Sequence, residues 1–527
     1  MTTTCSASHP AVCGPPRRWR LGDVLAETEA STPGRTALIV GADRRHISYR
    51  ELSAAAGDLA AALRRRGLRR GNVVGLQTAT SVHFVVALLA AARLGLIVAP
   101  HDPTLPGIEK HRRADLLGAR ATLVEGNVDD DGDCPDWPIV EGRLGLPTEV
   151  DAAMRPRTVE SPPALTSADA LIMATSGTSG SPKFVPWTHH NLAASLTSTA
   201  SSYALSYSDS TVAVMPLFHG HGLVAGLLAT LATGGSVLLP GAGRFSAHTF
   251  WDDVDAAEAT WFTAVPTMLR ILLDRAAVAG PDHCRNFGTL RFIRSCSAPL
   301  RADTITELES TFHAPVLGAY GMTETTHQAA TVRPGDGDDT RLHTVGGPTG
   351  LTARIHRADG AETPAGAAGE IWLRGPTVTR GYLPVTPDAR SQNALTFDGS
   401  WLRTGDLGVL DTAGRLIVTG RIKNLINRGG EKISPEHVEQ VLAADPRIGE
   451  VAVVGIPDST FGEQVAVAVV PSADTLTAEE ITAYCRSRLT RHETPEVIEI
   501  VHQLPLTAKG DIDRVRLRAL LSPTTDR

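Results

Sequence analysis

One segment of the chain combines small residues, hydroxyl groups and a lysine directly after an apolar stretch at residues 170–174. Its small and hydroxyl residues precede Lys183 and are Thr175, Ser176, Gly177, Thr178, Ser179 and Gly180. Small residues let successive backbone N–H groups face one anion, and the lysine adds a positive charge. The pattern indicates a phosphate-binding loop, although Phe184 after the lysine excludes a Walker loop. On its own, the loop is also compatible with a flexible surface turn.

Four more segments follow along the chain. Residues 215–223 read Met-Pro-Leu-Phe-His-Gly-His-Gly-Leu, residues 319–324 read Ala-Tyr-Gly-Met-Thr-Glu, and residues 401–406 read Trp-Leu-Arg-Thr-Gly-Asp. Residues 420–435 read Gly-Arg-Ile-Lys-Asn-Leu-Ile-Asn-Arg-Gly-Gly-Glu-Lys-Ile-Ser-Pro. Together with the loop, these segments resemble the ordered motifs of the adenylate-forming (ANL) superfamily of acyl-CoA synthetases, luciferases and peptide-synthetase adenylation domains. The resemblance runs from about residue 21 to the C-terminus.

The resemblance implies an enzyme that holds an acyl-adenylate and passes its acyl group to the thiol of coenzyme A. Its ligands would be a carboxylic acid, ATP or acyl-AMP, CoA and Mg²⁺, and a carrier-protein phosphopantetheine stays open as the acceptor. By motif, Thr323 would donate to the α-phosphate, and Glu324 would hold Mg²⁺, which prefers carboxylate and phosphate oxygens. Asp406 would accept both ribose hydroxyls and Arg421 would add a donor, although such residues in isolation are more often ordinary solvated charges.

The family pattern also assigns further nucleotide contacts and a hinge. The other residues at the adenylate are Lys183, Ala298, Ala319, Tyr320, Gly321, Met322, Gly429 and Gly430. Lys423 occupies the hinge position, where a few backbone dihedral angles would change as a small domain rotates between two half-reactions. That rotation does not require the lysine charge.

The acyl pocket is predicted around the two histidines of the second motif. His219 resembles the aromatic gate between the thiol tunnel and the carboxylate, although a packed core histidine is an alternative. Ser297 and His327, with the pattern at residues 244–251, resemble the oxalate-CoA ligase branch, in which a Ser and a His grip a second carboxylate. Gly220 stands where that branch has a larger residue, which predicts an enlarged pocket and leaves the acid unidentified.

The C-terminal segment departs from the family pattern. Residues 505–514 read Pro-Leu-Thr-Ala-Lys-Gly-Asp-Ile-Asp-Arg, which places Asp511 where the family has the lysine that bridges carboxylate and α-phosphate during adenylation. Loss of such a charged donor costs about 3 kcal/mol, or roughly 10²-fold to 10³-fold in rate. The thioester-forming step does not need this lysine. The sequence therefore predicts thioesterification with weak or absent adenylation, the acyl-AMP coming from a separate adenylating ligase.

Two alternatives stay open. Lys509 would replace the missing lysine in a complete ATP-dependent carboxylic acid-CoA ligase, although two residues of extended chain displace it by about 6.6 Å. The chain would alternatively be a non-catalytic protein that binds an adenylate. The retained phosphate loop, Thr323, Glu324 and Asp406 favour an enzyme.

The helices and strands that position these residues are predicted to form two domains, preceded by an N-terminal arm. Alternating helix and strand patterns over residues 47–100 and 170–295 predict a large α/β domain with parallel sheets. Glycine-punctuated strands after residue 350 indicate a small β-barrel-like part, before a small mobile α+β domain. We expect a disordered arm at residues 1–20, the AMP- and acyl-binding domain at 21–419 and the mobile C-terminal domain at 420–527.

Composition argues against several other classes. A formal net charge of −7 is atypical of proteins that bind nucleic acid or anionic membranes. The longest apolar run, residues 84–99, is interrupted by Arg93 and Gly95 and is short for a membrane span, so it predicts a buried helix leading into a strand. Residues 125–136, rich in Asp and Gly, predict a surface loop. The six cysteines lack paired spacing, which favours the reducing cytoplasm.

Overall fold

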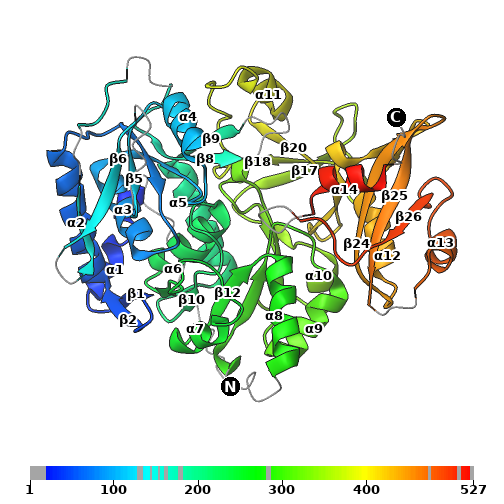
Figure 1. Cartoon of the computed structure of the whole chain (residues 1–527), viewed down its shortest axis with the longest axis horizontal. Coiled ribbons are helices and arrows are strands. Elements are labelled where there is room, and N and C mark those ends of the chain that lie inside the picture. The colour runs from blue at the N-terminus through cyan, green and yellow to red at the C-terminus, as the bar shows by residue number, and fades with distance from the viewer. Residues whose placement is uncertain are drawn as a thin grey trace, which may run out of the picture.

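The computed structural model consists of a large α/β part, a five-stranded antiparallel sheet and a smaller C-terminal α+β part (Figure 1). It describes residues 19–126, 134–142, 145–151, 155–159, 164–175, 182–279, 287–472, 476–506 and 512–522. In Figure 1 the C-terminal part, in orange and red, lies to one side of the large part. The architecture confirms the predicted α/β fold with parallel sheets and a small α+β C-terminal domain.

A seven-stranded sheet has the order β7-β6-β5-β3-β4-β8-β9, and its strands from β6 to β8 run parallel. The strands are β3 (Val73–Gln77), β4 (Ile97–Pro100), β5 (Ala119–Val124), β6 (Asp136–Glu141), β7 (Pro147–Val150), β8 (Asp169–Thr175) and β9 (Lys183–Thr188). At the sheet edge, β8 and β9 form an antiparallel hairpin in which Thr175 pairs with Lys183. The two ends of the predicted phosphate loop therefore lie side by side.

The helices of this region follow from local sequence signals. The helix α2 (Tyr49–Arg65) begins after Ser48, whose hydroxyl accepts from Glu51 N at 3.2 Å while the Glu51 carboxylate accepts from Ser48 N at 2.8 Å. The helix α3 (Val82–Leu94) ends at Gly95, at a φ of 75°, and leads into β4, which confirms the helix and strand predicted for the apolar run. The other helical segments are η1 (Leu21–Asp23), α1 (Ala26–Ser31) and α4 (Gly107–Leu117).

A nine-stranded sheet forms the second layer, in the order β16-β15-β14-β13-β12-β10-β11-β1-β2, with β14 to β1 parallel. Its strands are β1 (Thr36–Val40), β2 (Arg45–Ser48), β10 (Ser210–Val212), β11 (Ser236–Leu238), β12 (Trp261–Ala264), β13 (Phe292–Ser295), β14 (Val316–Tyr320), β15 (Ala330–Thr331) and β16 (Gly347–Pro348). Because β13 and β14 are parallel neighbours, the segments that follow them meet at one edge of the sheet, where α/β folds commonly bind ligands.

The connections of this sheet are mainly helical. They are α5 (His189–Tyr203), the π-helix η3 (His221–Leu228), α6 (Ala229–Ala232), α7 (Phe250–Ala256), α8 (Pro266–Ala279), η4 (Phe287–Thr289), α9 (Ala302–Phe312), η5 (Thr323–Thr325) and α10 (Asp338–His343). The π-helix begins at His221, inside the motif at residues 215–223, and π-helical turns often occur at functional sites.

The antiparallel sheet corresponds to the predicted β-barrel-like part. It contains β17 (Thr352–His356), β18 (Ala368–Arg374), β19 (Phe397–Asp398), β20 (Trp401–Leu410) and β21 (Leu416–Arg421), with α11 (Ala389–Thr396) before β19. The boundary predicted at residues 419 and 420 falls inside β21, and the short helix η6 (Ile422–Asn424) follows this strand.

The C-terminal part is a five-stranded sheet with helices against both faces. Its elements are β22 (Ile426–Arg428), β23 (Glu431–Ile433), α12 (Pro435–Ala443), β24 (Ile448–Asp458), β25 (Gly462–Pro471), α13 (Ala478–Arg486), β26 (Val497–Ile500) and α14 (Arg514–Leu521). One apolar core forms under α12 and α13 and a second under α14. The Ser434 hydroxyl donates to Thr419 O at 3.0 Å, and Arg301 donates to Ala443 O. The C-terminal part therefore contacts the larger part through two hydrogen bonds that join residues before η6 to residues after it.

Within the described ranges, no helix is long and apolar enough to cross a membrane. The surface loop predicted at residues 125–136 falls largely on residues 127–133, outside the described ones. The same holds for residues 1–18 of the predicted N-terminal arm.

Candidate active site

The ends of the predicted phosphate loop lie next to a buried tyrosine. Of the loop residues, Thr175 and Lys183 are described, whereas Ser176, Gly177, Thr178, Ser179 and Gly180 lie outside the described residues. The Lys183 ammonium lies over the Tyr382 ring, 4.8 Å from its centroid. The Tyr382 hydroxyl in turn donates to Glu324 Oε1 at 2.7 Å. The lysine of the loop and the predicted magnesium ligand therefore share one neighbour.

Thr323 and Glu324 lie on η5, directly after β14. The backbone of this turn is held from two sides, because Trp187 Nε1 donates to Thr323 O and Thr379 N donates to Glu324 O, both at 2.8 Å. Burial and the negative charge of Glu324 raise the pKa of Tyr382, so its hydroxyl remains a donor. The turn presents the Glu324 carboxylate to the same tyrosine that Lys183, at the end of the phosphate loop, contacts.

The donor set around Glu324 fits a magnesium ion that arrives with a nucleotide. No cluster of three or more His, Cys, Asp or Glu side chains with metal-binding geometry occurs in the part of the chain that the structure describes. Mg²⁺ commonly binds through one or two carboxylates, substrate phosphates and water, so one buried carboxylate beside a phosphate loop is sufficient. Such an ion would neutralise phosphate charge, and Glu324 would hold it in place.

Asp406, the predicted ribose ligand, is buried between two donors. The Tyr320 hydroxyl donates to its Oδ2 at 2.6 Å, and the Arg421 Nε lies 2.6 Å from its Oδ1. Asp406 on β20 pairs directly with Arg421 on β21, so the sheet register sets this ion pair. Burial raises the pKa of Asp406, and Arg421 opposes that effect. Each carboxylate oxygen has the capacity to accept a further hydrogen bond, as binding of a ribose would require.

The predicted hinge residue, Lys423, adds to a group of cations. It lies exposed on η6, and desolvation together with the positive charges of Arg421 and Lys183 lowers its pKa, while Asp406 opposes this. Arg421 and Lys423 are two positions apart, and the fold adds Lys183 from β9 to the same group of charges. The excess positive charge suits the phosphates of an adenylate.

The remaining predicted nucleotide residues lie at the carboxyl edge of the nine-stranded sheet or in the first hairpin of the C-terminal part. Ala319 and Tyr320 end β14, Gly321 and Met322 follow it, Ala298 follows β13, and Gly429 and Gly430 form the turn between β22 and β23. A Cβ on Gly321 would lie 1.6 Å from His327 O, so only glycine fits there. This glycine therefore lets the adenylate motif pack against the predicted acyl pocket.

The predicted acyl-pocket residues have unusual backbone conformations. Ser297 and His327 adopt φ values of 81° and 84°, and Thr326 adopts 51°. Non-glycine residues rarely adopt this left-handed region, and such strain concentrates at functional sites. The His327 ring stacks on the ring of His221 with centroids 5.0 Å apart, and Ser297 Oγ lies 3.3 Å from His221 Nδ1. The structure thus brings both predicted residues to one histidine.

The enlarged pocket expected at Gly220 is not found. A Cβ at this position would lie 2.8 Å from Trp187 Cη2 and 3.4 Å from His327 Cβ, so the indole already fills the space. The preceding residue, His219, is half-buried, and the centroid of its ring lies 4.5 Å from the ring centroid of Phe218. Its role as a gate stays a prediction.

We expect Gly220→Ala to displace the Trp187 indole and to weaken its hydrogen bond to Thr323 O. Overpacking of this kind costs about 1–3 kcal/mol, which would lower the free energy of unfolding and raise the KM for an acyl-adenylate. Gly226→Ala is the matched control, because its Cβ would meet only Thr263 Cγ2 at 3.9 Å. Equal unfolding free energies and KM values for the two variants would contradict the packing at Gly220.

Sequence analysis missed four residues of this site: Trp187, Tyr382, His221 and Arg294. His221 was inside a recognised motif, but only the fold shows that it faces Ser297 and His327. Arg294 is fully buried in β13, where an arginine within an apolar strand was the available signal. Trp187 and Tyr382 carry no such signal, because aromatic residues in apolar segments are usually ordinary core residues.

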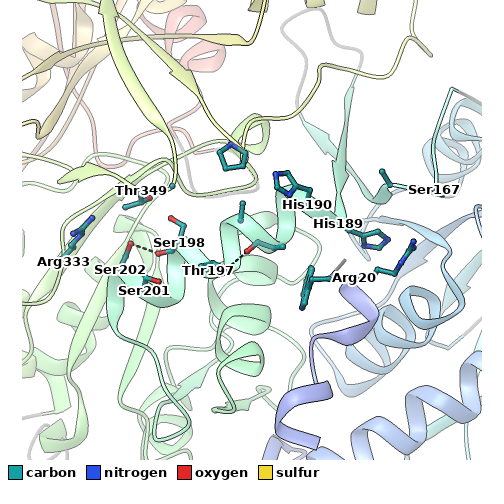
Figure 2. Close-up of a pocket in the computed structure, with 16 residues that line it drawn as sticks. Arg20, Ser167, His189, His190, Thr197, Ser198, Ser201, Ser202, Arg333 and Thr349 are labelled. Atoms are coloured by element: carbon teal, nitrogen blue, oxygen red, sulfur yellow. Dashed lines mark hydrogen bonds between the residues drawn. The ribbon is translucent and has the colours of Figure 1, made fainter. Parts of the chain in front are cut away.

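A cavity of about 1060 Å³ lies along α5, away from these residues. Figure 2 shows Arg20 and Arg333 at opposite ends of the cavity, with hydroxyl side chains of α5 between them. None of the predicted site residues lines it. It is therefore a separate feature from the adenylate site.

The segment that departs from the family pattern is described only at its flanks. Lys509 and Asp511 lie outside the described residues. On either side, Leu506 and Ile512 form an antiparallel bridge, and Arg514 donates to Glu439 Oε1 at 2.8 Å. The flanks are thereby fixed to the C-terminal part.

Comparisons with known proteins identify the family of this chain. The model of the AMP-binding enzyme family matches residues 25–383, and that of the AMP-binding enzyme C-terminal domain matches residues 437–511. Oxalate–CoA ligase of Arabidopsis thaliana is 39% identical over 482 residues, which cover 85% of this chain and 88% of that protein. Sulfoacetate–CoA ligase of Cupriavidus necator is 33% identical, with 94% and 97% covered.

The fold is also similar to solved structures. ATP-bound MatB from Rhodopseudomonas palustris superposes with a TM-score of 0.81 at 28% identity, over 95% of this chain and 98% of that one. Both family models match, and relatives of this identity cover most of the chain. The chain belongs to the AMP-binding enzyme family, as an acyl-CoA ligase of the adenylate-forming superfamily.

Proposed function

We propose that this acyl-CoA ligase transfers an acyl group from acyl-AMP to the thiol of CoA and has a weak or absent ATP-dependent adenylation step. Asp511 carries the proposal, because it places a carboxylate where the family has the lysine that joins two anions. A negative side chain at that point repels both the substrate carboxylate and the α-phosphate. The acyl-AMP would then come from a separate adenylating ligase.

The groups that would bind the adenylate are retained. Asp406 would accept the ribose hydroxyls, Lys183 and Arg421 would face the phosphate, and Glu324 would hold Mg²⁺ when ATP is the ligand. Lys423 would act as the hinge between a large domain at residues 21–419 and a mobile one at 420–527. These features support binding of ATP or acyl-AMP, and the ATP-bound MatB structure shows that this fold accommodates ATP.

The acid would be a small one with a second anionic group. Ser297 and His327 meet at the predicted acyl pocket, and two relatives are named for oxalate and sulfoacetate, which each carry two acidic groups. Hydroxyl and imidazole donors are suited to such a second group. His219 would separate this pocket from the thiol tunnel.

A panel of synthetic acyl-AMP compounds tests the proposal. With CoA and without ATP, we expect thioester formation from at least one acyl-AMP whose acyl group carries a second carboxylate, and slower formation from the acid, ATP, Mg²⁺ and CoA. The readout is acyl-CoA by chromatography. Equal rates with the two substrate sets would favour a complete ligase that uses Lys509. No thioester from any acyl-AMP would favour a protein that only binds adenylates.

A further inference from the structure

Arg294 makes five hydrogen bonds in the interior and is fully buried. Its Nε donates to the Tyr203 hydroxyl at 2.7 Å. The other four contacts are from Nη1 to Thr263 Oγ1 at 3.0 Å and His221 Nε2 at 3.1 Å, and from Nη2 to His327 Nε2 at 3.1 Å and Gln328 Oε1 at 3.3 Å. A guanidinium has five N–H groups, so its donor capacity is fully used.

None of these five acceptors is a carboxylate. Within the ranges that the structure describes, Arg294 forms no ion pair with an Asp or Glu side chain. A buried cation is normally paired, because removing a charge from water is costly. The guanidinium is therefore held by neutral groups, and its positive charge remains unbalanced behind the acyl pocket.

The arginine determines which nitrogen of each histidine carries the proton. A guanidinium only donates, so the lone pairs of His221 Nε2 and His327 Nε2 face Arg294. His221 Nε2 also lies 2.6 Å from the Thr263 hydroxyl, which accepts from Arg294 and therefore keeps its own hydrogen for this nitrogen. Burial, together with the positive charge of Arg294, holds the pKa of both histidines well below the usual range, so both rings are neutral. A neutral imidazole that accepts at Nε2 carries its hydrogen on Nδ1.

This assignment sets the direction of the next hydrogen bond. His221 Nδ1 lies 3.3 Å from Ser297 Oγ, so His221 donates and Ser297 accepts. The Ser297 hydroxyl hydrogen is then free to donate to another acceptor. Because this residue is exposed, a ligand can supply that acceptor. The Nδ1–H of His327 likewise has no hydrogen-bond partner among the described residues. Two donors therefore remain for a ligand.

We propose that Arg294 is the positioning residue of the acyl pocket. By fixing His221 and His327 as Nδ1–H tautomers, it leaves the Ser297 O–H and the His327 N–H as donors to an acceptor group on the acyl chain. The preferred acyl chain ends in a carboxylate or sulfonate, whose negative charge also balances the buried guanidinium. A terminal ammonium is excluded, because it offers only donors and carries the same charge as Arg294. The proposal rests on the proposed function for the location of the acyl pocket.

Nitrogen NMR of histidine-labelled protein tests the assignment without any substitution. In the wild type, we expect the signals of His221 and His327, assigned by His221→Gln and His327→Gln, to show a protonated Nδ1 and an unprotonated Nε2 at neutral pH. In Arg294→Met, which removes the donors at similar volume, the His221 signals should shift toward a mixture of tautomers. A protonated Nε2 on either ring of the wild type would overturn the proposal.

Ligand binding tests the consequence for specificity and needs no catalysis. The ligands are two non-hydrolysable acyl-sulfamoyl adenosines, one with a terminal carboxylate and one with a methyl group in its place. Calorimetry should show at least tenfold weaker binding of the carboxylate compound to Arg294→Met and less than threefold change for the methyl compound. Arg294→Lys, which keeps the charge but not the fork of donors, should recover only part of the loss.

Equal losses for the two compounds would mean a purely structural role for Arg294 and would overturn the proposal. Folding of each variant is checked by its affinity for AMP, which lacks an acyl group. If the wild type binds both compounds but forms no thioester from acyl-AMP and CoA, the proposed function fails while the tautomer assignment is still tested.

Discussion

Asp511→Lys is expected to raise the rate of ATP–pyrophosphate exchange with the cognate acid by roughly 10²-fold to 10³-fold. The substitution restores a cation between the substrate carboxylate and the α-phosphate, and it removes a negative charge that repels both. Asp406, Lys183 and Glu324, which we propose to bind ribose, phosphate and magnesium during adenylation, are all present. Exchange of labelled pyrophosphate into ATP measures this half-reaction without CoA.

Two matched variants separate the causes of this gain. Asp511→Asn removes the repulsion without adding a cation, so its exchange rate should lie between those of the wild type and Asp511→Lys. Lys509→Ala should change the wild-type rate little. If Lys509→Ala abolished a rapid wild-type exchange, the chain would instead be a complete ligase in which that lysine acts from a shifted position.

Asp406→Asn is expected to weaken binding of an acyl-adenylate analogue by roughly 10²-fold to 10³-fold. A hydrogen bond to a charged group contributes about 1.5–3 kcal/mol, and the ribose would lose two charged acceptors at once. The amide also leaves Arg421 without its ion pair, which adds to the local positive charge. Calorimetric titration with a non-hydrolysable analogue measures the affinity.

Tyr320→Phe is the control for this prediction. It removes the 2.6 Å hydrogen bond to Asp406 Oδ2 but keeps the carboxylate, so its affinity loss should be much smaller than that of Asp406→Asn. Thermal unfolding of both variants shows whether the buried site remains folded. Similar losses for the two variants would mean that the tyrosine, rather than the carboxylate charge, dominates binding.

The elements that sequence analysis predicted well depend on local patterns. The apolar run at residues 84–99 became α3 and β4, because Gly95 ends the helix and apolar residues resume after it. The strand β10 ends at Val212, although apolar residues continue to Met215. Strand ends depend on pairing with neighbours, and Val212 is the last residue of this strand that pairs with β11 and β12.

The acyl pocket was less predictable, because its contacts join residues far apart in the chain. The acceptors of Arg294 lie 31 to 91 positions away, so no local pattern reveals that its five donors are satisfied. The expectation at Gly220 failed for the same reason. The size of one residue was considered without the Trp187 indole, which the β9 strand brings against it.

The pairing of Asp406 with Arg421 has a mechanical consequence. Arg421 is the last residue of β21 and lies two positions before Lys423. In the rotation that we propose about Lys423, atoms next to this residue would move a short distance, whereas those at the far end of the C-terminal part would move much further. Asp406 and Arg421 would thus remain paired at the ribose while the rotation changes which residues of the C-terminal part face the acyl group.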